Sequence, residues 1–388
     1  MTIEKYHIKE YLIKQQFNPN FRKKILMNKM NAAVIGVGQM GGTHVEAALE
    51  SPFIDKVYGY EPDPERCKER CGKYNIIPAD LNAILDDKSI GFVSIASPNE
   101  THVELAEKCL RAGKAVVVEK PMGTTLAEAK HLCEVEKETG GFLQVGFELH
   151  YSKMYQTVKD WINADLIGTP VNNQCRYYCC EFHKKNTWRS LSTGSFLIGE
   201  KLSHYLDLQR WYFDETPESV YSLSSAKVGP YVTHRDNHQI MTRYPNGKVA
   251  VLNFIMYIAE SHLNRDPLQD GRNEVDDGHF LQYHICGTKG AIETDVFKHR
   301  IRRWEFSDKP EYMDSNIVEE ITFDARTEGK LYYHNVHGQN LRVIELAATG
   351  QKSEMTAREA YESMKLCFAA ELSEDTGELI KFDDPRLA

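Results

Sequence analysis

The chain has 388 residues, of which 41% are hydrophobic and 27% are charged, a balance typical of globular proteins. At roughly 100–200 residues per domain, this length predicts two domains. The net charge of −9 argues against nucleic acid or an anionic membrane as the main partner. Because the sequence has neither an apolar run of about 18 residues nor an N-terminal apolar stretch, we expect a cytoplasmic protein without a membrane span.

The first 30 residues are polar and rich in lysine, which predicts an N-terminal extension (residues 1–30). Short apolar runs then alternate with amphipathic segments. The expected strands lie at 32–35, 56–60, 90–96, 115–118 and 142–146. The expected helices lie at 43–50, 64–73, 99–111 and 125–139. Because strands and helices alternate throughout, we expect one α/β domain at 31–150 with a doubly wound parallel sheet.

The pattern changes after Tyr151. A helix is expected at 152–164, followed by consecutive strands without intervening helices, which indicates an antiparallel or mixed sheet. These strands are expected at 171–182, 219–227, 237–244, 248–258, 279–286 and 291–295. Asn246-Gly247 is a strong hairpin signal between two of them, and the polar stretch 261–278 predicts a long loop. The second domain is therefore expected at 151–388, and its final helices, at 337–349 and 356–372, can pack back on the first domain.

A glycine-rich pattern directly follows the first expected strand and opens the first helix. It consists of Gly36, Gly38, Gln39, Met40 and Gly41. The first glycine permits a tight turn, the second lets the backbone approach a pyrophosphate, and the third lets helix and strand pack closely. The phosphates would then bind free N–H groups at the positive end of the helix. The context therefore predicts a dinucleotide site.

The cofactor preference depends on the residue that follows the second strand. Glu61 occupies this place, where a carboxylate can accept hydrogen bonds from the ribose 2′-hydroxyl. Such a carboxylate repels the 2′-phosphate of NADP, and no arginine or lysine immediately follows it. We therefore expect NAD as the cofactor.

Further motifs extend along the chain. They are Ser97-Pro98-Asn99 with His102, Ala112-Gly113-Lys114, Glu119-Lys120-Pro121, Gly194-Ser195-Phe196-Leu197 with His204 and Asp207, and Ile285-Cys286-Gly287-Thr288-Lys289-Gly290. Together with the glycine pattern, and over roughly residues 31–370, the chain resembles the glucose–fructose oxidoreductase/inositol dehydrogenase/MocA (Gfo/Idh/MocA) family.

The resemblance implies a Rossmann domain followed by an α/β domain with a large, open, mostly antiparallel sheet. That sheet is expected to make the contact of a homodimer or homotetramer. The resemblance also implies hydride transfer between NAD and a secondary hydroxyl of a sugar, glycoside or cyclitol. Further cofactor-binding residues that it implies are Ser97, Pro98, Asn99, His102, Glu119 and Lys120.

Three residues are expected to carry the chemistry. Lys120 lies at the carboxyl end of a strand, where doubly wound sheets place ligands, and is suited to polarise the reacting oxygen. His204 is the candidate acid/base, because imidazole titrates near neutrality. Asp207 lies one helical turn further on and is expected to orient His204 or to hold a substrate hydroxyl.

The chain departs from the family pattern around His204. The acidic residue often found four positions earlier is Glu200, the small residue two positions earlier is Leu202, and Trp211 replaces a residue that handles the proton in some members. These differences favour His204 as the acid/base and leave the path of the proton open. Candidate substrate-binding residues are Glu148, His150, Arg176, Trp188, Arg189, Glu200 and His337.

The nine cysteines are interpreted mostly as small buried hydrophobic residues of a reducing compartment. Cys175, Cys179, Cys180 and His183 are close in sequence, but their spacing is not a zinc pattern, and no metal is expected.

Three hypotheses remain open at the level of the sequence. The first is the sugar, glycoside or cyclitol dehydrogenase, with oxidation at C3 of a glycoside as one version. The second is an NAD-dependent glycoside hydrolase in which transient oxidation assists cleavage and NAD is regenerated. The third is a non-catalytic sensor of NAD or sugar, which the presence of Lys120 and His204 disfavours.

Overall fold

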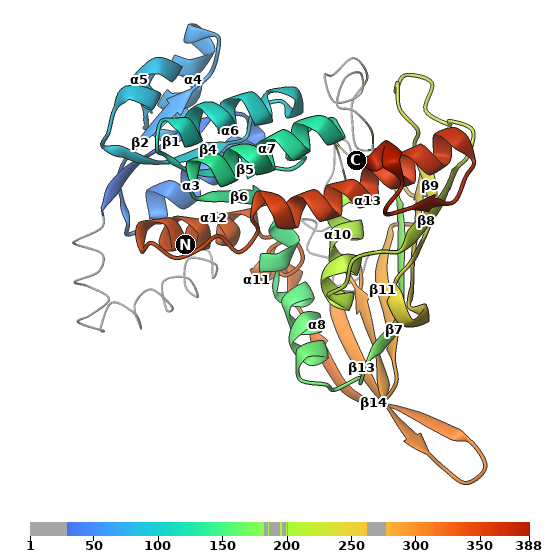
Figure 1. The fold of residues 1–388 in the computed structure, drawn as a ribbon. Helices are drawn as coiled ribbons and strands as arrows, with labels where there is room; N and C mark the ends of the chain where they lie inside the picture. The colour runs from blue at the N-terminus through green and yellow to red at the C-terminus, as the bar shows by residue number, and fades with distance from the viewer. Residues whose placement is uncertain (1–28, 182–184, 186–194, 196–198, 200, 262–276) are drawn as a thin grey trace. The chain divides into compact units, whose positions relative to one another are not determined.

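The structure is a computed structural model that describes residues 29–181, 185, 195, 199, 201–261 and 277–388 (Figure 1). Residues 1–28 of the expected N-terminal extension and most of the expected loop at 261–278 lie outside these residues, whereas Met30, expected in the extension, begins the first strand. The chain forms two compact units. Unit 1 contains the described residues up to Glu148 together with Asn335–Tyr361, and unit 2 contains those of Leu149–His334 with Glu362–Ala388. In the described part of the chain, no helix is long and apolar enough to cross a membrane.

Unit 1 is built on a six-stranded sheet with the order β3-β2-β1-β4-β5-β6, in which every pair is parallel. The strands are β1 (Met30–Ile35), β2 (Ile54–Tyr60), β3 (Ile77–Pro78), β4 (Ile90–Ile95), β5 (Ala115–Glu119) and β6 (Leu143–Gly146). The central strands are nearly continuous apolar runs, such as the fully buried Val116–Val118, because helices cover both faces of the sheet.

The connections of unit 1 are helical. They are α3 (Gln39–Glu50), α4 (Pro64–Tyr74), α5 (Leu81–Asp86), η1 (Asn99–Thr101), α6 (His102–Arg111) and α7 (Leu126–Thr139), and α12 (Val336–Ala348) joins them from the end of the chain. Figure 1 shows α3 and α12 on one face of the sheet and α6 and α7 on the other. Val343 and Ile344 of α12 belong to the same core cluster as Val34 and Val45, so α12 completes the core of this unit.

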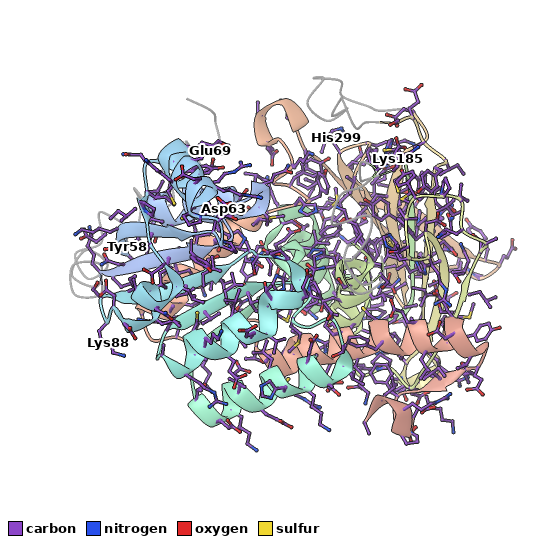
Figure 2. All side chains as sticks on the ribbon, turned by 90° about the horizontal axis from the view of Figure 1, so that it is seen from above. Tyr58, Asp63, Glu69, Lys88, Lys185 and His299 are labelled. Atoms are coloured by element: carbon purple, nitrogen blue, oxygen red, sulfur yellow. The ribbon has the colours of Figure 1, made fainter. Side chains whose placement is uncertain are left out.

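Local signals set the helix ends in unit 1. Thr125 caps α7 through a capping box with Glu128, and Gly140 ends that helix in the left-handed conformation. Asp63, labelled in Figure 2 among the side chains of the described residues, caps α4 by accepting a hydrogen bond from the N–H of Arg66 at 2.8 Å.

Unit 2 is built on a nine-stranded sheet with the order β14-β13-β12-β11-β7-β10-β9-β8-β15. The strands are β7 (Pro170–Cys179), β8 (Ser219–Ser224), β9 (Asn237–Arg243), β10 (Val249–Met256), β11 (Phe280–Gly287), β12 (Gly290–Asp295), β13 (Arg300–Asp308), β14 (Met313–Thr322) and β15 (Ile380–Lys381). Only β7 and β10 pair in parallel. The expected fold class, a doubly wound parallel sheet followed by a large, mostly antiparallel sheet, is confirmed.

Helices pack on one face of this sheet. Among the helices on this face are α8 (Lys153–Asn163) and α10 (Leu202–Phe213). Two further helices, α11 (Ala325–Glu328) and α13 (Ala357–Thr376), follow later in the chain. Tyrosine rings fill the space beneath α8 and α10, where Tyr283 of the sheet donates a hydrogen bond to the carbonyl oxygen of Tyr205 at 2.9 Å. Because strand side chains alternate, the residues between these core positions point to the opposite, open face.

The sequence predicts one hairpin of this sheet and misses another. Asn246 and Gly247 connect β9 to β10. Both have positive φ, 60° and 76°, which tight hairpin turns need and which asparagine and glycine adopt readily. The long hairpin of β13 and β14, drawn in orange in Figure 1, was not expected from the sequence.

Candidate functional site

The glycine turn between β1 and α3 has the geometry that a dinucleotide requires. Gly36 has a φ of +88°, and a Cβ there would lie 2.7 Å from the carbonyl oxygen of Ala96. A Cβ on Gly41 would lie 1.8 Å from the Gly36 carbonyl oxygen, whereas one on Gly38 would meet nothing within 4 Å. Gly38 is also the N-cap of α3, without a side chain to cap the helix. The turn therefore leaves open space at the positive end of α3, which fits a pyrophosphate.

Glu61 directly follows β2, as the ribose-binding role requires. Its side chain is 9% exposed, and one carboxylate oxygen lies 3.5 Å from Nε of Arg66, whose side chain is largely exposed. An arginine therefore lies beside the carboxylate, a contact that the sequence did not reveal because Arg66 comes from the first turns of α4.

A side-chain hydrogen bond inside the turn after β4 stabilises it. The hydroxyl of Ser97 lies 2.6 Å from that of Thr101, and Pro98 precedes the short helix η1. The helix that the sequence predicts from residue 99 starts at His102 instead, because the chain first makes the 3-10 turn η1, whose first residue, Asn99, is buried.

His102 uses both ring nitrogens on backbone carbonyl oxygens. Nδ1 lies 2.8 Å from the oxygen of Pro121, and Nε2 lies 3.0 Å from that of Ser97. The ring is 1% exposed. His102 was expected to bind the cofactor, but its ring nitrogens are engaged by the protein itself.

Lys120 follows β5 directly, and the Lys120–Pro121 peptide bond is cis. The preceding residue, Glu119, is buried and lies 3.0 Å from Nε2 of His44, whose Nδ1 contacts the hydroxyl of Ser94. Burial alone would raise the pKa of Glu119, but the hydrogen bond and charge of His44 and the charge of Lys120 lower it below its ordinary value. Glu119 is therefore a structural anion beside Lys120, and its carboxylate is taken up by His44.

In unit 2, Asp207 lies on α10 and is 1% exposed. One carboxylate oxygen lies 2.6 Å from Nε2 of His150, and the other accepts a hydrogen bond from the hydroxyl of Ser363 at 2.5 Å. Burial opposes ionisation, but His150, Arg210 and Ser363 together hold the pKa of Asp207 below its ordinary value. The structure thus pairs Asp207 with His150 rather than with His204.

His204 is buried on the same helix, and its ring lies 6.1 Å from that of His334, edge to face. Trp211 stacks on His150, with 4.1 Å between the ring centroids and 17° between the planes. The proton-handling position that Trp211 fills is therefore used to pack the partner of Asp207.

Three other candidate residues have defined surroundings. Glu148 is buried, and its carboxylate accepts a hydrogen bond from the backbone N–H of Asn335 at 2.8 Å. His337 lies 3.3 Å from Glu50, at the end of α3 opposite the glycine turn. Arg176 lies over the ring of Phe280 at 5.1 Å.

The structure separates Arg176 from the candidate histidines of unit 2. Its neighbours Cys175 and Tyr177 are buried on the helix-covered face of the sheet, so Arg176 points to the open face. Trp188, Arg189 and Glu200, as well as His183, lie outside the described residues.

Sequence reasoning missed His44, Ser94, Arg210 and Ser363. The signal for His44 was its place three residues after Gly41, which puts it on the same side of α3 as the glycine. For Ser363 no local signal exists, because it lies 156 residues from Asp207.

Comparisons with known proteins match this architecture. Residues 30–147 match the model of an oxidoreductase family with an NAD-binding Rossmann fold, and residues 155–293 match the GFO/IDH/MocA C-terminal domain. The chain belongs to the Gfo/Idh/MocA oxidoreductase family. The resemblance seen in the sequence is thereby confirmed, and the N-terminal unit carries the NAD-binding Rossmann domain of this family, as expected for an NAD cofactor.

Relatives in the Gfo/Idh/MocA family include proteins named for polyol substrates. An inositol 2-dehydrogenase of Salmonella paratyphi B is 26% identical over 223 residues, which cover 56% of this chain and 65% of that protein. A levoglucosan dehydrogenase of Pseudarthrobacter phenanthrenivorans is 27% identical over 314 residues, covering 71% of this chain and 75% of that protein. The chain thus spans a little under two thirds of the inositol 2-dehydrogenase.

A solved structure of levoglucosan dehydrogenase in complex with NADH and levoglucosan has the same fold. It superposes with a TM-score of 0.74 at 20% identity and covers 92% of this chain and 100% of its own. A protein from Kribbella flavida described as an oxidoreductase domain protein superposes with a TM-score of 0.75 at 18% identity, covering 92% and 100%.

Proposed function

We propose that this chain is an NAD-dependent oxidoreductase that transfers a hydride between nicotinamide and a secondary hydroxyl of a sugar, glycoside or cyclitol. The observation that carries the proposal is the place of Lys120, directly after β5 of the parallel sheet that also bears the glycine turn. Ligands of such sheets bind at the carboxyl ends of the strands. The relatives named for inositol and levoglucosan support a polyol substrate.

Each residue has one task in this proposal. NAD, when bound, supplies the nicotinamide that accepts the hydride. The ammonium of Lys120 donates a hydrogen bond to the reacting oxygen and stabilises the negative charge that develops on it. His204 accepts the hydroxyl proton, and Asp207 orients the neighbouring His150. The glycine turn and Glu61 bind the pyrophosphate and the adenine ribose.

We assign cofactor binding to residues 31–150 and substrate binding and assembly to residues 151–388. The narrower form of the proposal places oxidation at C3 of a glycoside, which would acidify the neighbouring C–H bond. We place the protein in the cytoplasm, where its nine cysteines, all free in the structure, would stay reduced.

The direct test is NADH absorbance after the purified protein is mixed with NAD⁺ and a panel of sugars, glycosides and inositols. A signal confined to polyols with a free secondary hydroxyl supports the proposal, and loss of the signal with 3-deoxy glycosides supports the narrower form. Glycoside cleavage without net NADH would instead indicate the redox-assisted hydrolase. NADH binding with neither activity would indicate a sensor.

Replacing Glu61 is expected to shift the cofactor preference. The Glu61→Ser variant removes the charge that repels a 2′-phosphate and leaves the largely exposed Arg66 available to bind it. We expect the ratio of kcat/KM for NADP⁺ to that for NAD⁺ to rise at least about tenfold. The matched control is Glu65→Ser, four residues away on an exposed face of α4. An unchanged ratio in Glu61→Ser would remove Glu61 from the ribose site.

We also propose that the open face of the nine-stranded sheet joins two copies of the chain into a homodimer, or pairs of them into a homotetramer. This face exposes Leu223 and Met241, which are 50% and 55% exposed. The double variant Leu223→Glu/Met241→Glu should halve the molar mass measured by light scattering. Leu49→Glu, equally exposed but on α3, should leave it unchanged. A native mass equal to that of one chain would refute the assignment.

A further inference from the structure

Both ring nitrogens of the buried His102 face atoms that can only accept hydrogen bonds. The partners are the carbonyl oxygens of Pro121, 2.8 Å from Nδ1, and of Ser97, 3.0 Å from Nε2. A neutral imidazole carries one N–H and can satisfy one of them, whereas an imidazolium satisfies both. The neutral ring must therefore bond one of the two segments and leave the other carbonyl facing a lone pair.

The surroundings of His102 favour the neutral ring over the imidazolium. Burial, the largest influence, and the charge of Lys120 hold the pKa of His102 below its ordinary value, although the two carbonyl oxygens and the charge of Glu119 act in the opposite direction. Glu119 is itself bonded to His44 from α3. The pull of two carbonyl acceptors thus opposes the cost of burying a cation.

The two carbonyls belong to the turn after β4 and the turn after β5. Ser97 lies in the turn after β4, and its Cα would be 2.8 Å from a Cβ on Gly36, so this turn packs against the glycine turn. Pro121 follows Lys120 in the turn after β5. One buried ring therefore joins the turn that backs the dinucleotide site to the turn that carries Lys120.

We propose that His102 is a positioning residue whose two neutral tautomers serve two separable tasks: with the proton on Nε2 it bonds Ser97 and holds that turn for the cofactor, and with the proton on Nδ1 it bonds Pro121 and so sets Lys120. This deepens the proposed function, on which the importance of Lys120 rests. The placement of the two turns themselves does not depend on which substrate is oxidised.

The test uses two substitutions that each keep one of the bonds. The amide nitrogen of asparagine takes the place of Nδ1, so His102→Asn keeps a donor to Pro121 and loses the bond to Ser97. The amide nitrogen of glutamine reaches the place of Nε2, so His102→Gln keeps the donor to Ser97 and loses the bond to Pro121. The matched controls are the same two changes at His131, an exposed residue of α7 bonded to Glu107.

Three quantities are measured on the full chain: the Kd for NADH by fluorescence titration, kcat with the best polyol, and the pH dependence of Lys120 acylation by mass spectrometry. His102→Asn should weaken NADH binding about fivefold with kcat within about twofold of native. His102→Gln should leave the Kd nearly unchanged, lower kcat about fivefold and shift the acylation profile of Lys120.

The proposal requires that the two variants lose different functions. Equal losses in both variants on all three quantities, or no loss in either, would overturn the proposal, because a merely structural histidine cannot separate cofactor binding from Lys120. If the native protein oxidises no polyol, the proposed function fails. The NADH and acylation measurements then still decide the role of His102.

Discussion

Lys120→Met is expected to lower kcat/KM for polyol oxidation by about 100- to 10,000-fold while the Kd for NADH stays within about twofold of native. Lys120 is the cation placed at the end of β5, and the adjacent Glu119 carboxylate is already bonded to His44. Methionine preserves the length of the side chain but cannot donate a hydrogen bond or carry charge. The loss should therefore fall on the transition state and spare the dinucleotide.

The measurement is steady-state kinetics of NAD⁺ reduction together with fluorescence titration of NADH. Lys108→Met is the control, because Lys108 is an exposed residue of α6 that pairs with Glu104. Its kinetics should match those of the native protein. Turnover by Lys120→Met at more than a tenth of the native rate would exclude Lys120 from the reaction, whatever the substrate.

Asp207→Ala is expected to cost about 3–5 kcal/mol in the free energy of unfolding, because it removes a buried carboxylate whose hydrogen-bond partners are also buried. Both carboxylate oxygens are engaged, by His150 at 2.6 Å and by Ser363 at 2.5 Å, and Ser363 also accepts a hydrogen bond from Arg210 at 2.9 Å. Alanine would leave these donors buried without an acceptor. The same change should lower activity, since His150 loses the group that orients it.

The destabilisation caused by Asp207→Ala should decrease as the pH falls. The folded state holds the pKa of Asp207 below its unfolded value, so its stabilisation is fully present above the unfolded pKa of about 4. It is lost as the pH falls through the lower, folded value. Urea unfolding at a series of pH values should therefore show the difference between native protein and variant shrinking in acid. Asp160→Ala, at an exposed site on α8, is the control. A cost below about 1 kcal/mol at pH 7 would contradict the buried-pair account.

Local sequence patterns predicted most of unit 1. The apolar run ending at Ile35, the glycines after it and the caps at Thr125 and Gly140 each act within a few residues. Such signals are readable because strand burial, turn conformation and helix capping depend on neighbouring residues. The same holds for Asn246 and Gly247, whose conformations make the hairpin between β9 and β10.

The strands β13 and β14 escaped prediction for a physical reason. β14 carries Asp314, Glu319 and Glu320 and has no buried residue, so it shows no alternation between a core face and a solvent face. β14 is an edge strand of the sheet, where charged side chains prevent further pairing. Its strand conformation comes from pairing with β13, which includes ion pairs such as Arg302 with Glu320.

In the candidate site, too, local motifs were predicted and long-range contacts were not. Lys120 and the glycines were found because their motifs are contiguous and have a fixed place beside strands. The partner of Asp207 was not, because His150 is 57 residues away and Ser363 is 156 residues away. Helical spacing suggested His204 as the partner, but a longer-range contact satisfies the carboxylate instead.

The place of α12 in unit 1 has a consequence for biosynthesis. Val343 and Ile344 complete the core around β1 and α3, although they lie about 300 residues further along the chain. On the ribosome, the parallel sheet and α3 can be made early, but the part of that face which α12 covers stays exposed until α12 has emerged. Nascent chains that stop before residue 336 should thus expose that apolar surface and depend on chaperones, and the unit that binds the cofactor is among the last parts of the molecule to become complete.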